Sequence, residues 1–240
     1  MNEPRRVELA PAWVLHRYPY RETSLIVEAL TRDYGRVGIV ARGARGPRRQ
    51  GEALMPFAPL AISFRQRGEL ANLTGAESAG PAYAFTGKIF LAACYVNELV
   101  LRLLARDDPA PEIYRLYSET LAALGAEPAP AVRRFEGRLI PALGFPLPLT
   151  QDVSGNPLVA DLRYRYDPEH GPMPALAKAP GHSGAMLAAV AAERFDDPAV
   201  LAVAGEIFRG VIASHLGGRR LKSLDVTREL TREAREGMMR

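Results

Sequence analysis

Two short runs of β-forming residues flank a turn near the N-terminus of this chain. They read Ser24-Leu25-Ile26-Val27-Glu28-Ala29-Leu30-Thr31, then Asp33-Tyr34-Gly35, then Arg36-Val37-Gly38-Ile39-Val40-Ala41-Arg42. In the second run Val37, Ile39 and Ala41 alternate with their neighbours, and this period of two is typical of a half-buried strand. The aspartate and glycine between the runs favour a tight turn. The pattern predicts a β-hairpin over residues 24–42.

Similar runs lie on both sides of this hairpin. We expect further strands at Trp13–Arg17, at Leu60–Arg65 and at Leu70–Gly75. Glycine and proline recur every few residues between 43 and 51, which predicts a loop there. Five short strands without a helical pattern between them indicate a small closed β-barrel or a sandwich.

After about residue 85 the hydrophobic period changes to roughly 3.5 residues, which is typical of helices. Ile89, Ala93, Val96, Val100 and Leu103 then share one face. We expect helices from Thr86 to before Asp107, over Pro111–Leu124, around 132–143 with a kink near Pro141, after Ser183, and from Pro198 to Leu216. A two-stranded element is expected around 162–166. The expected fold class is α+β, with a five-stranded barrel domain at 1–80 and a mainly helical domain at 81–240 that contains an irregular insertion at 145–182.

Composition and charge limit the class of protein. The chain has 240 residues, of which 48% are hydrophobic and 24% charged, as in soluble globular proteins, and no apolar run spans a bilayer. The single cysteine, Cys94, excludes an internal disulfide and a cysteine-rich zinc site. Residues 1–75 carry 12 Arg against 7 acidic residues, a net charge of +5. This excess is compatible with a polyanionic partner, but charge alone favours the simpler explanation, a solvated arginine-rich surface.

Catalytic and metal sites are not evident. The histidines at 16, 170, 182 and 215 lack the spacing of metal ligands, and Cys94 lies in an apolar helical stripe. Gly181-His182-Ser183-Gly184-Ala185 approaches the hydrolase pattern G-x-S-x-G, but loop-type residues precede it, and Ser183 as a helix cap explains the same residues. We therefore expect no enzyme activity, no metal and no cofactor, with a hydrolase that uses Ser183 as an open alternative.

Binding residues are more evident than catalytic ones. Arginines at 42, 45, 48 and 49 occupy the predicted 43–51 loop or its edge, and other arginines bracket the turns. Aromatic residues are interleaved with them: Trp13, Tyr18, Tyr20, Tyr34 and Phe64. Basic loops and aromatic rings on a five-stranded barrel suit single-stranded nucleic acid, because guanidinium groups contact phosphates and rings stack on bases. For each ring by itself, core packing is the favoured explanation over base stacking. An OB-fold RNA-binding factor is the alternative function.

Nine short blocks, in order along the chain, carry a resemblance to a known family. They are Val14-Leu15-His16, Pro19-Tyr20-Arg21-Glu22-Thr23-Ser24-Leu25, Gly35-Arg36-Val37, Val40-Ala41-Arg42-Gly43-Ala44-Arg45, Pro56-Phe57-Ala58-Pro59-Leu60, Asn97-Glu98-Leu99, Arg133-Arg134-Phe135-Glu136, Leu143-Gly144-Phe145 and Leu216-Gly217-Gly218-Arg219-Arg220-Leu221-Lys222-Ser223. Together they resemble the RecO family of bacterial DNA repair proteins. The likeness covers most of the chain and is weakest from 150 to 200.

The resemblance implies an N-terminal OB-fold, a helical C-terminal domain and a non-enzymatic recombination mediator of the RecF pathway in the bacterial cytoplasm and nucleoid. Such proteins bind single- and double-stranded DNA, anneal complementary strands and, with RecR, help RecA displace single-strand binding protein (SSB). The DNA-contacting candidates that it implies are Arg21, Arg36, Arg42, Arg45, Arg48, Arg49, Arg219, Arg220 and Lys222. Arg133 or Arg134 would pair with the carboxylate of the acidic SSB tail, and Phe135 would line an apolar groove unless it only packs within its helix.

The sequence departs from the family at one place. Some members carry a four-cysteine zinc site near the segment that matches Gln151-Asp152-Val153-Ser154-Gly155, and this chain has no cysteine there. We therefore expect no zinc, and a 150–172 loop held by packing around Tyr164 and Tyr166.

Overall fold

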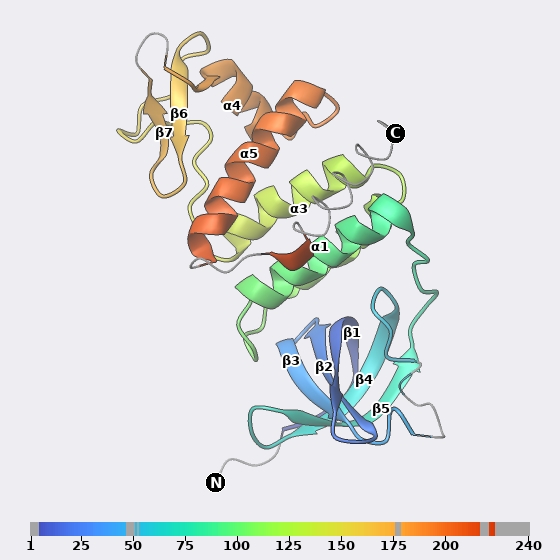
Figure 1. The fold of residues 1–240 in the computed structure, drawn as a ribbon. Coiled ribbons are helices and arrows are strands. Elements are labelled where there is room, and N and C mark those ends of the chain that lie inside the picture. The colour runs from blue at the N-terminus through green and yellow to red at the C-terminus, as the bar shows by residue number, and fades with distance from the viewer. Residues whose placement is uncertain (1–4, 47–50, 52, 176–178, 217–220, 224–240) are drawn as a thin grey trace. The chain divides into compact units, whose positions relative to one another are not determined.

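The computed structural model describes residues 5–46, 51, 53–175, 179–216 and 221–223, with strands followed mainly by helices (Figure 1). This arrangement confirms the expected α+β class. The chain forms two compact units, one of residues up to Ala122 with those from Leu221 onward, the other of Ala123–Arg220. The boundary between domains near residue 80 stays a prediction.

The strands of the first unit form a closed barrel. They are β1 (Arg5–Tyr20), β2 (Ser24–Thr31), β3 (Gly35–Ala41), β4 (Pro59–Gln66) and β5 (Ala71–Ser78), in the spatial order β1-β2-β3-β5-β4. β1 pairs with both β2 and β4, which closes the barrel, and β3 and β5 pair in parallel at Ile39 and Ala71. This is the order of an OB-fold, so the predicted barrel is confirmed.

β1 is much longer than the predicted strand Trp13–Arg17. Its register shifts twice, between Val7 and Ala10 against β4 and between Val14 and His16 against β2. Each bulge bends the strand. The bent strand can pair with β2 along one edge and with β4 along the other, which closes the barrel. The bulges also interrupt the alternation of apolar residues, which is why the sequence pattern shows only the middle of the strand.

The first two helices of the chain are α1 (Gly87–Leu103) and α2 (Pro111–Leu124). The side-chain nitrogen Nδ2 of Asn97 in α1 donates to the carbonyl oxygen of Leu15 in β1 at 2.9 Å, and the hydroxyl of Tyr117 donates to Asn97 Oδ1 at 2.6 Å. The indole nitrogen of Trp13 donates to Ser118 Oγ at 2.9 Å. These bonds join the barrel to both helices within the first unit.

The second unit contains α3 (Pro128–Ala142), α4 (Gly184–Ala191) and α5 (Pro198–His215). α3 and α5 approach closely at Gly137, where an added Cβ would lie 3.0 Å from the ring of Phe208. The unit also holds a sheet of β6 (Arg163–Asp167), β7 (Gly171–Pro174) and β8 (His182–Ser183), in the order β7-β6-β8. The predicted two-stranded element is therefore a three-stranded sheet.

Two side chains close the loop before β6: Asp152 lies within the loop and Tyr164 in β6 itself. Asp152 Oδ1 accepts hydrogen bonds from the backbone nitrogens of Ser154 and Asn156, both at 2.9 Å. Tyr164 is 2% exposed, and its hydroxyl accepts from the nitrogen of Val159 at 3.0 Å. The packing around Tyr164 agrees with the sequence-based expectation, whereas Tyr166 is only partly buried. In the part of the chain that the structure describes, no group of three or more His, Cys, Asp and Glu residues could hold a metal ion.

No helix among the described residues has the length and apolar character needed to cross a membrane.

Candidate nucleic-acid interface

One part of the outer surface of the barrel is open and carries aromatic rings. His16, Tyr18 and Tyr20 alternate along β1, and strand geometry places such residues on one face. Tyr18 is 46% exposed. It lies opposite Ile26 of β2, which in turn lies opposite Val40 of β3. Tyr18, Ile26 and Val40 therefore form a row across three neighbouring strands.

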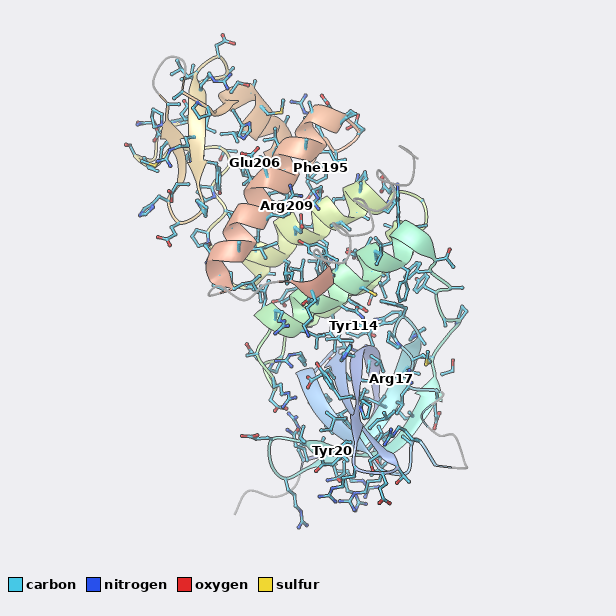
Figure 2. The ribbon with its side chains drawn as sticks, in the orientation of Figure 1. Arg17, Tyr20, Tyr114, Phe195, Glu206 and Arg209 are labelled. Carbon is cyan, nitrogen blue, oxygen red and sulfur yellow. The ribbon has the colours of Figure 1, made fainter. Side chains whose placement is uncertain are left out.

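A second row lies at the β1–β2 turn. Tyr20 pairs with Ser24, and Arg42 follows the last residue of β3. The guanidinium carbon of Arg21 lies 5.1 Å from the centre of the Tyr20 ring, a distance at which cation and ring attract. The exposed side chain of Arg42 makes no hydrogen bond or ion pair with any residue that the structure describes. Figure 2 shows Tyr20 at the end of the barrel that lies away from Tyr114 of α2.

Arg45 fixes the loop after β3 against this turn. Its Nη2 donates to the carbonyl oxygens of Arg21 and Glu22, both at 2.7 Å, and its backbone nitrogen donates to the oxygen of Thr23 at 2.8 Å. The side chain is exposed, so its charge remains available to an anion while it holds the two loops together. We call the surface formed by Tyr18, Tyr20, Arg21, Ile26, Val40, Arg42 and Arg45 the open face.

The neighbouring part of the same outer surface is covered. Glu28 of β2 is 3% exposed and accepts a hydrogen bond from Arg36 Nη1 at 2.7 Å, while Arg106 also pairs with it. Arg36 Nε donates to the carbonyl oxygen of Leu104 at 2.9 Å. A Cβ added to Gly38 would lie 2.9 Å from the Arg106 guanidinium carbon. The predicted DNA contact Arg36 is thus held inside this ion-pair cluster, and we do not include it in the open face.

Lys222 belongs to the first unit, although it follows the whole second unit in the sequence. It is exposed, and Leu221 before it is 7% exposed. Partial burial lowers the pKa of His16, and the carboxylate of Glu28 opposes that shift. The charges of Arg17 and Lys222 lower it further. Geometry also places Lys222 here: its backbone nitrogen bonds Glu98 of α1, and the preceding residue, Asn97, donates to the carbonyl oxygen of Leu15, next to His16 in β1.

The other predicted residues fall into two groups. Arg48, Arg49, Arg219 and Arg220 lie outside the described residues. Among the rings, Trp13 is 5% and Phe64 0% exposed, so both are core, and Tyr34 packs edge-on against Phe64 at 5.9 Å. Sequence reasoning missed Ile26 and Val40 because their place on the open face depends on strand register.

The predicted SSB-tail residues all lie on α3 of the second unit. Phe135 is 0% exposed, so its ring is core and does not line a surface groove. Arg134 pairs with Glu127 at 2.5 Å, and Arg133 pairs with the buried Glu136 at 2.7 Å. A Cβ added to Gly205 would lie 2.8 Å from Arg133 Nη1 and 2.9 Å from Nη1 of Arg209.

Two guanidinium groups therefore converge over Gly205, and Arg209 was not predicted. It lies on α5 with Glu206, as Figure 2 shows.

Ser183 is a helix cap. Its hydroxyl accepts a hydrogen bond from the nitrogen of Met186 at 3.2 Å, at the start of α4. A two-residue strand, β8, precedes that helix, where the sequence predicted a loop. The φ of Ser183 is −71°, which lacks the strain of a nucleophile elbow. The capping interpretation is confirmed.

Comparison with known proteins gives the family. The model for the N-terminal domain of recombination protein O matches residues 7–82, and the C-terminal model matches residues 85–225. A DNA repair protein RecO from Alkalilimnicola ehrlichii is 43% identical over 236 residues, covering 96% of this chain and 94% of that protein. The protein of that name from Halorhodospira halophila is 43% identical over 226 residues, covering 92% and 96%, respectively. The chain therefore belongs to the RecO family of DNA repair proteins.

Proposed function

We propose that this protein acts in DNA repair as a non-enzymatic recombination mediator that binds single-stranded DNA on the open face. The observation that carries this proposal is the combination of exposed Tyr18 with the cations Arg21, Arg42 and Arg45 on adjoining strands and loops. OB-folds bind oligonucleotides on the face of strands 2 and 3 and with the loops that join strands 1 to 2 and 4 to 5. Ile26 and Val40 lie on strands 2 and 3, and Arg21 lies in the turn between strands 1 and 2. Each base stacked on a ring contributes about 1–3 kcal/mol, largely without regard to sequence.

Annealing then needs no catalytic side chain. Two DNA strands repel each other through their phosphates, and cations that neutralise one strand lower the cost of bringing the second strand close. Counterion release makes this binding weaken as salt rises. Duplex DNA is the second nucleic-acid ligand that we propose, through phosphate contacts alone. With RecR, the bound protein would help RecA displace SSB from DNA.

The test of the DNA surface is the salt dependence of binding. We would measure the anisotropy of a labelled single-stranded oligonucleotide with the wild-type protein and with R21A/R42A. Each lost phosphate contact reduces the slope of log K against log salt by about 0.7 for single strands. The double variant loses two contacts, so its slope is lower by about 1.4. The ratio of wild-type to variant affinity therefore falls by about sevenfold as salt rises from about 50 to 200 mM.

The matched control is R115A. This arginine is 73% exposed on α2 and pairs with Glu119 at 3.4 Å. The R115A variant therefore removes one positive charge from the same unit at a site outside the open face. An R21A/R42A slope equal to that of R115A would refute the phosphate contacts. Tighter binding of RNA than of DNA of equal length would instead favour the alternative, an RNA-binding factor.

We also propose that the second unit binds the acidic SSB tail through the guanidinium pair of Arg133 and Arg209. Arg133 alone is a poor probe, because its removal leaves the buried Glu136 carboxylate without this partner. Arg209 is exposed, so R209A tests the site with less effect on folding. We expect R209A to weaken binding of an SSB-tail peptide and to leave DNA binding unchanged. Equal losses on both ligands would contradict separate sites.

A further inference from the structure

The segment Leu221–Ser223 is attached to α1 by one carboxylate. Glu98 Oε1 accepts from the backbone nitrogen of Lys222 at 3.0 Å, and Oε2 accepts from the nitrogen and the hydroxyl of Ser223 at 2.8 and 2.7 Å. The side chain of Leu221 is buried beside this contact. Although the segment follows the second unit in the sequence, it belongs to the first.

This contact uses the carboxylate as a cap. Two successive backbone N–H groups point at Glu98, in the way that an acidic N-cap satisfies the start of a helix. Burial disfavours the ionised form of Glu98, but the hydrogen bonds from Ser223 and Lys222, together with the charge of Arg102 at 3.6 Å, outweigh it, so the pKa of Glu98 lies below its ordinary value. Glu98 is thus ionised at neutral pH, and the contact is charge-assisted.

The attachment places a cation next to the β1 row. The backbone of Lys222 is held by Glu98 while its side chain remains exposed. The residue before Glu98, Asn97, bonds the carbonyl oxygen of Leu15, which precedes His16 in β1. His16, Tyr18 and Tyr20 follow one another at alternate positions of β1, a span of about 13 Å at 3.3 Å per residue. A strand of DNA that leaves the open face along β1 would meet Lys222 next.

We propose that Glu98 is a positioning residue for nucleic-acid binding, holding the 221–223 segment so that Lys222 extends the open face along β1. The proposal rests on the proposed function, because it adds a phosphate contact to that surface. The proposal predicts that removing this acidic residue changes DNA affinity in the opposite direction to the ordinary one. Removing an acidic side chain from a DNA-binding unit ordinarily strengthens binding, since it reduces repulsion of phosphates. Here, removing Glu98 weakens binding, since Lys222 is released.

The experiment is a thermodynamic cycle on single-stranded DNA binding, measured by anisotropy between about 50 and 200 mM salt. We expect K222A to reduce the salt slope by about 0.7, which makes its affinity penalty about threefold larger at the lower salt. E98A gives the same reduction, and E98Q, which keeps one acceptor oxygen, gives a smaller one. The double variant E98A/K222A binds no more weakly than K222A, because the two residues act through one contact.

The control for charge is E119A, since Glu119 is a half-exposed carboxylate on α2 of the same unit. It leaves DNA binding unchanged or slightly stronger. Urea unfolding followed by Trp13 fluorescence shows whether the barrel of each variant is folded. K222A alters an exposed side chain, so it tests the proposal even where E98A unfolds.

The outcomes separate this proposal from the proposed function. Stronger DNA binding by folded E98A, or penalties of E98A and K222A that add in the double variant, would overturn the positioning role. A K222A variant with wild-type affinity and slope, beside a clear loss in R21A/R42A, would overturn it and leave the open face standing. If neither K222A nor R21A/R42A changes binding, the proposed function itself fails.

Discussion

The hydrogen-bonded pair of Asn97 and Tyr117 allows a quantitative test of how the barrel is joined to its helices. Asn97 is 5% exposed and bonds both the Leu15 carbonyl oxygen and the Tyr117 hydroxyl. Burial raises the pKa of Tyr117, so this hydroxyl stays protonated and needs an acceptor. In N97A both groups lose their partner inside the protein. An unsatisfied buried polar group costs about 1–3 kcal/mol, so for the two groups together we expect N97A to lose roughly 2–6 kcal/mol of unfolding free energy.

The assay is urea unfolding followed by tryptophan fluorescence. Trp13 is the single tryptophan of the chain, and its ring lies 5.8 Å from that of Tyr117, so the signal reports on this junction rather than on the second unit. Y117F removes the hydroxyl that N97A leaves unpaired. N97A/Y117F is therefore expected to lose less stability than the sum of the single variants, by about 1 kcal/mol. A loss below about 0.5 kcal/mol in N97A, or full additivity, would refute the role assigned to this pair.

Two further predictions concern charge within the first unit. In E28Q the guanidinium groups of Arg36 and Arg106 lose their shared carboxylate, so we expect the unfolding free energy in the same urea assay to fall by about 3 kcal/mol. The control E77Q alters an exposed carboxylate on β5 and is expected to change it little. Equal urea midpoints for the two variants would contradict this. For His16, the folded pKa lies below 6.5, so the unfolded chain binds the proton first and stability falls as pH drops through 6.5. H16Q should show a smaller difference in urea midpoint between pH 8 and pH 5.5 than the wild type, and an unchanged difference would exclude this histidine as the cause.

Local sequence pattern predicts most elements of this fold. The hairpin of residues 24–42 and the helix over Pro111–Leu124 agree with β2, β3 and α2, because alternation, turn residues and helix-starting prolines act over a few residues. The length of β1 and the parallel pairing of β3 with β5 depend on bulges and on strand partners distant in sequence. No local pattern encodes either feature.

The candidate site shows the same division. The turn cations Arg21, Arg42 and Arg45 lie together because neighbouring strands bring their ends together. The pattern of the loop after β3 suggested Arg42 and Arg45, and the family resemblance suggested Arg21. Arg36 looked equivalent, yet the buried carboxylate of Glu28 and the chain around Leu104 hold it. Whether an arginine is free or paired is decided by tertiary contacts, which composition cannot show.

The most direct test of the account is annealing of complementary DNA strands at rising salt. One strand carries a donor fluorophore and the other an acceptor, and the rate of energy transfer is followed with wild-type protein and with R21A/R42A. The account predicts that wild-type protein accelerates annealing at low salt, that salt suppresses this acceleration, and that R21A/R42A loses most of it. Equal acceleration by the variant, or no binding and no acceleration by the wild type at low salt, would contradict a nucleic-acid role for the open face.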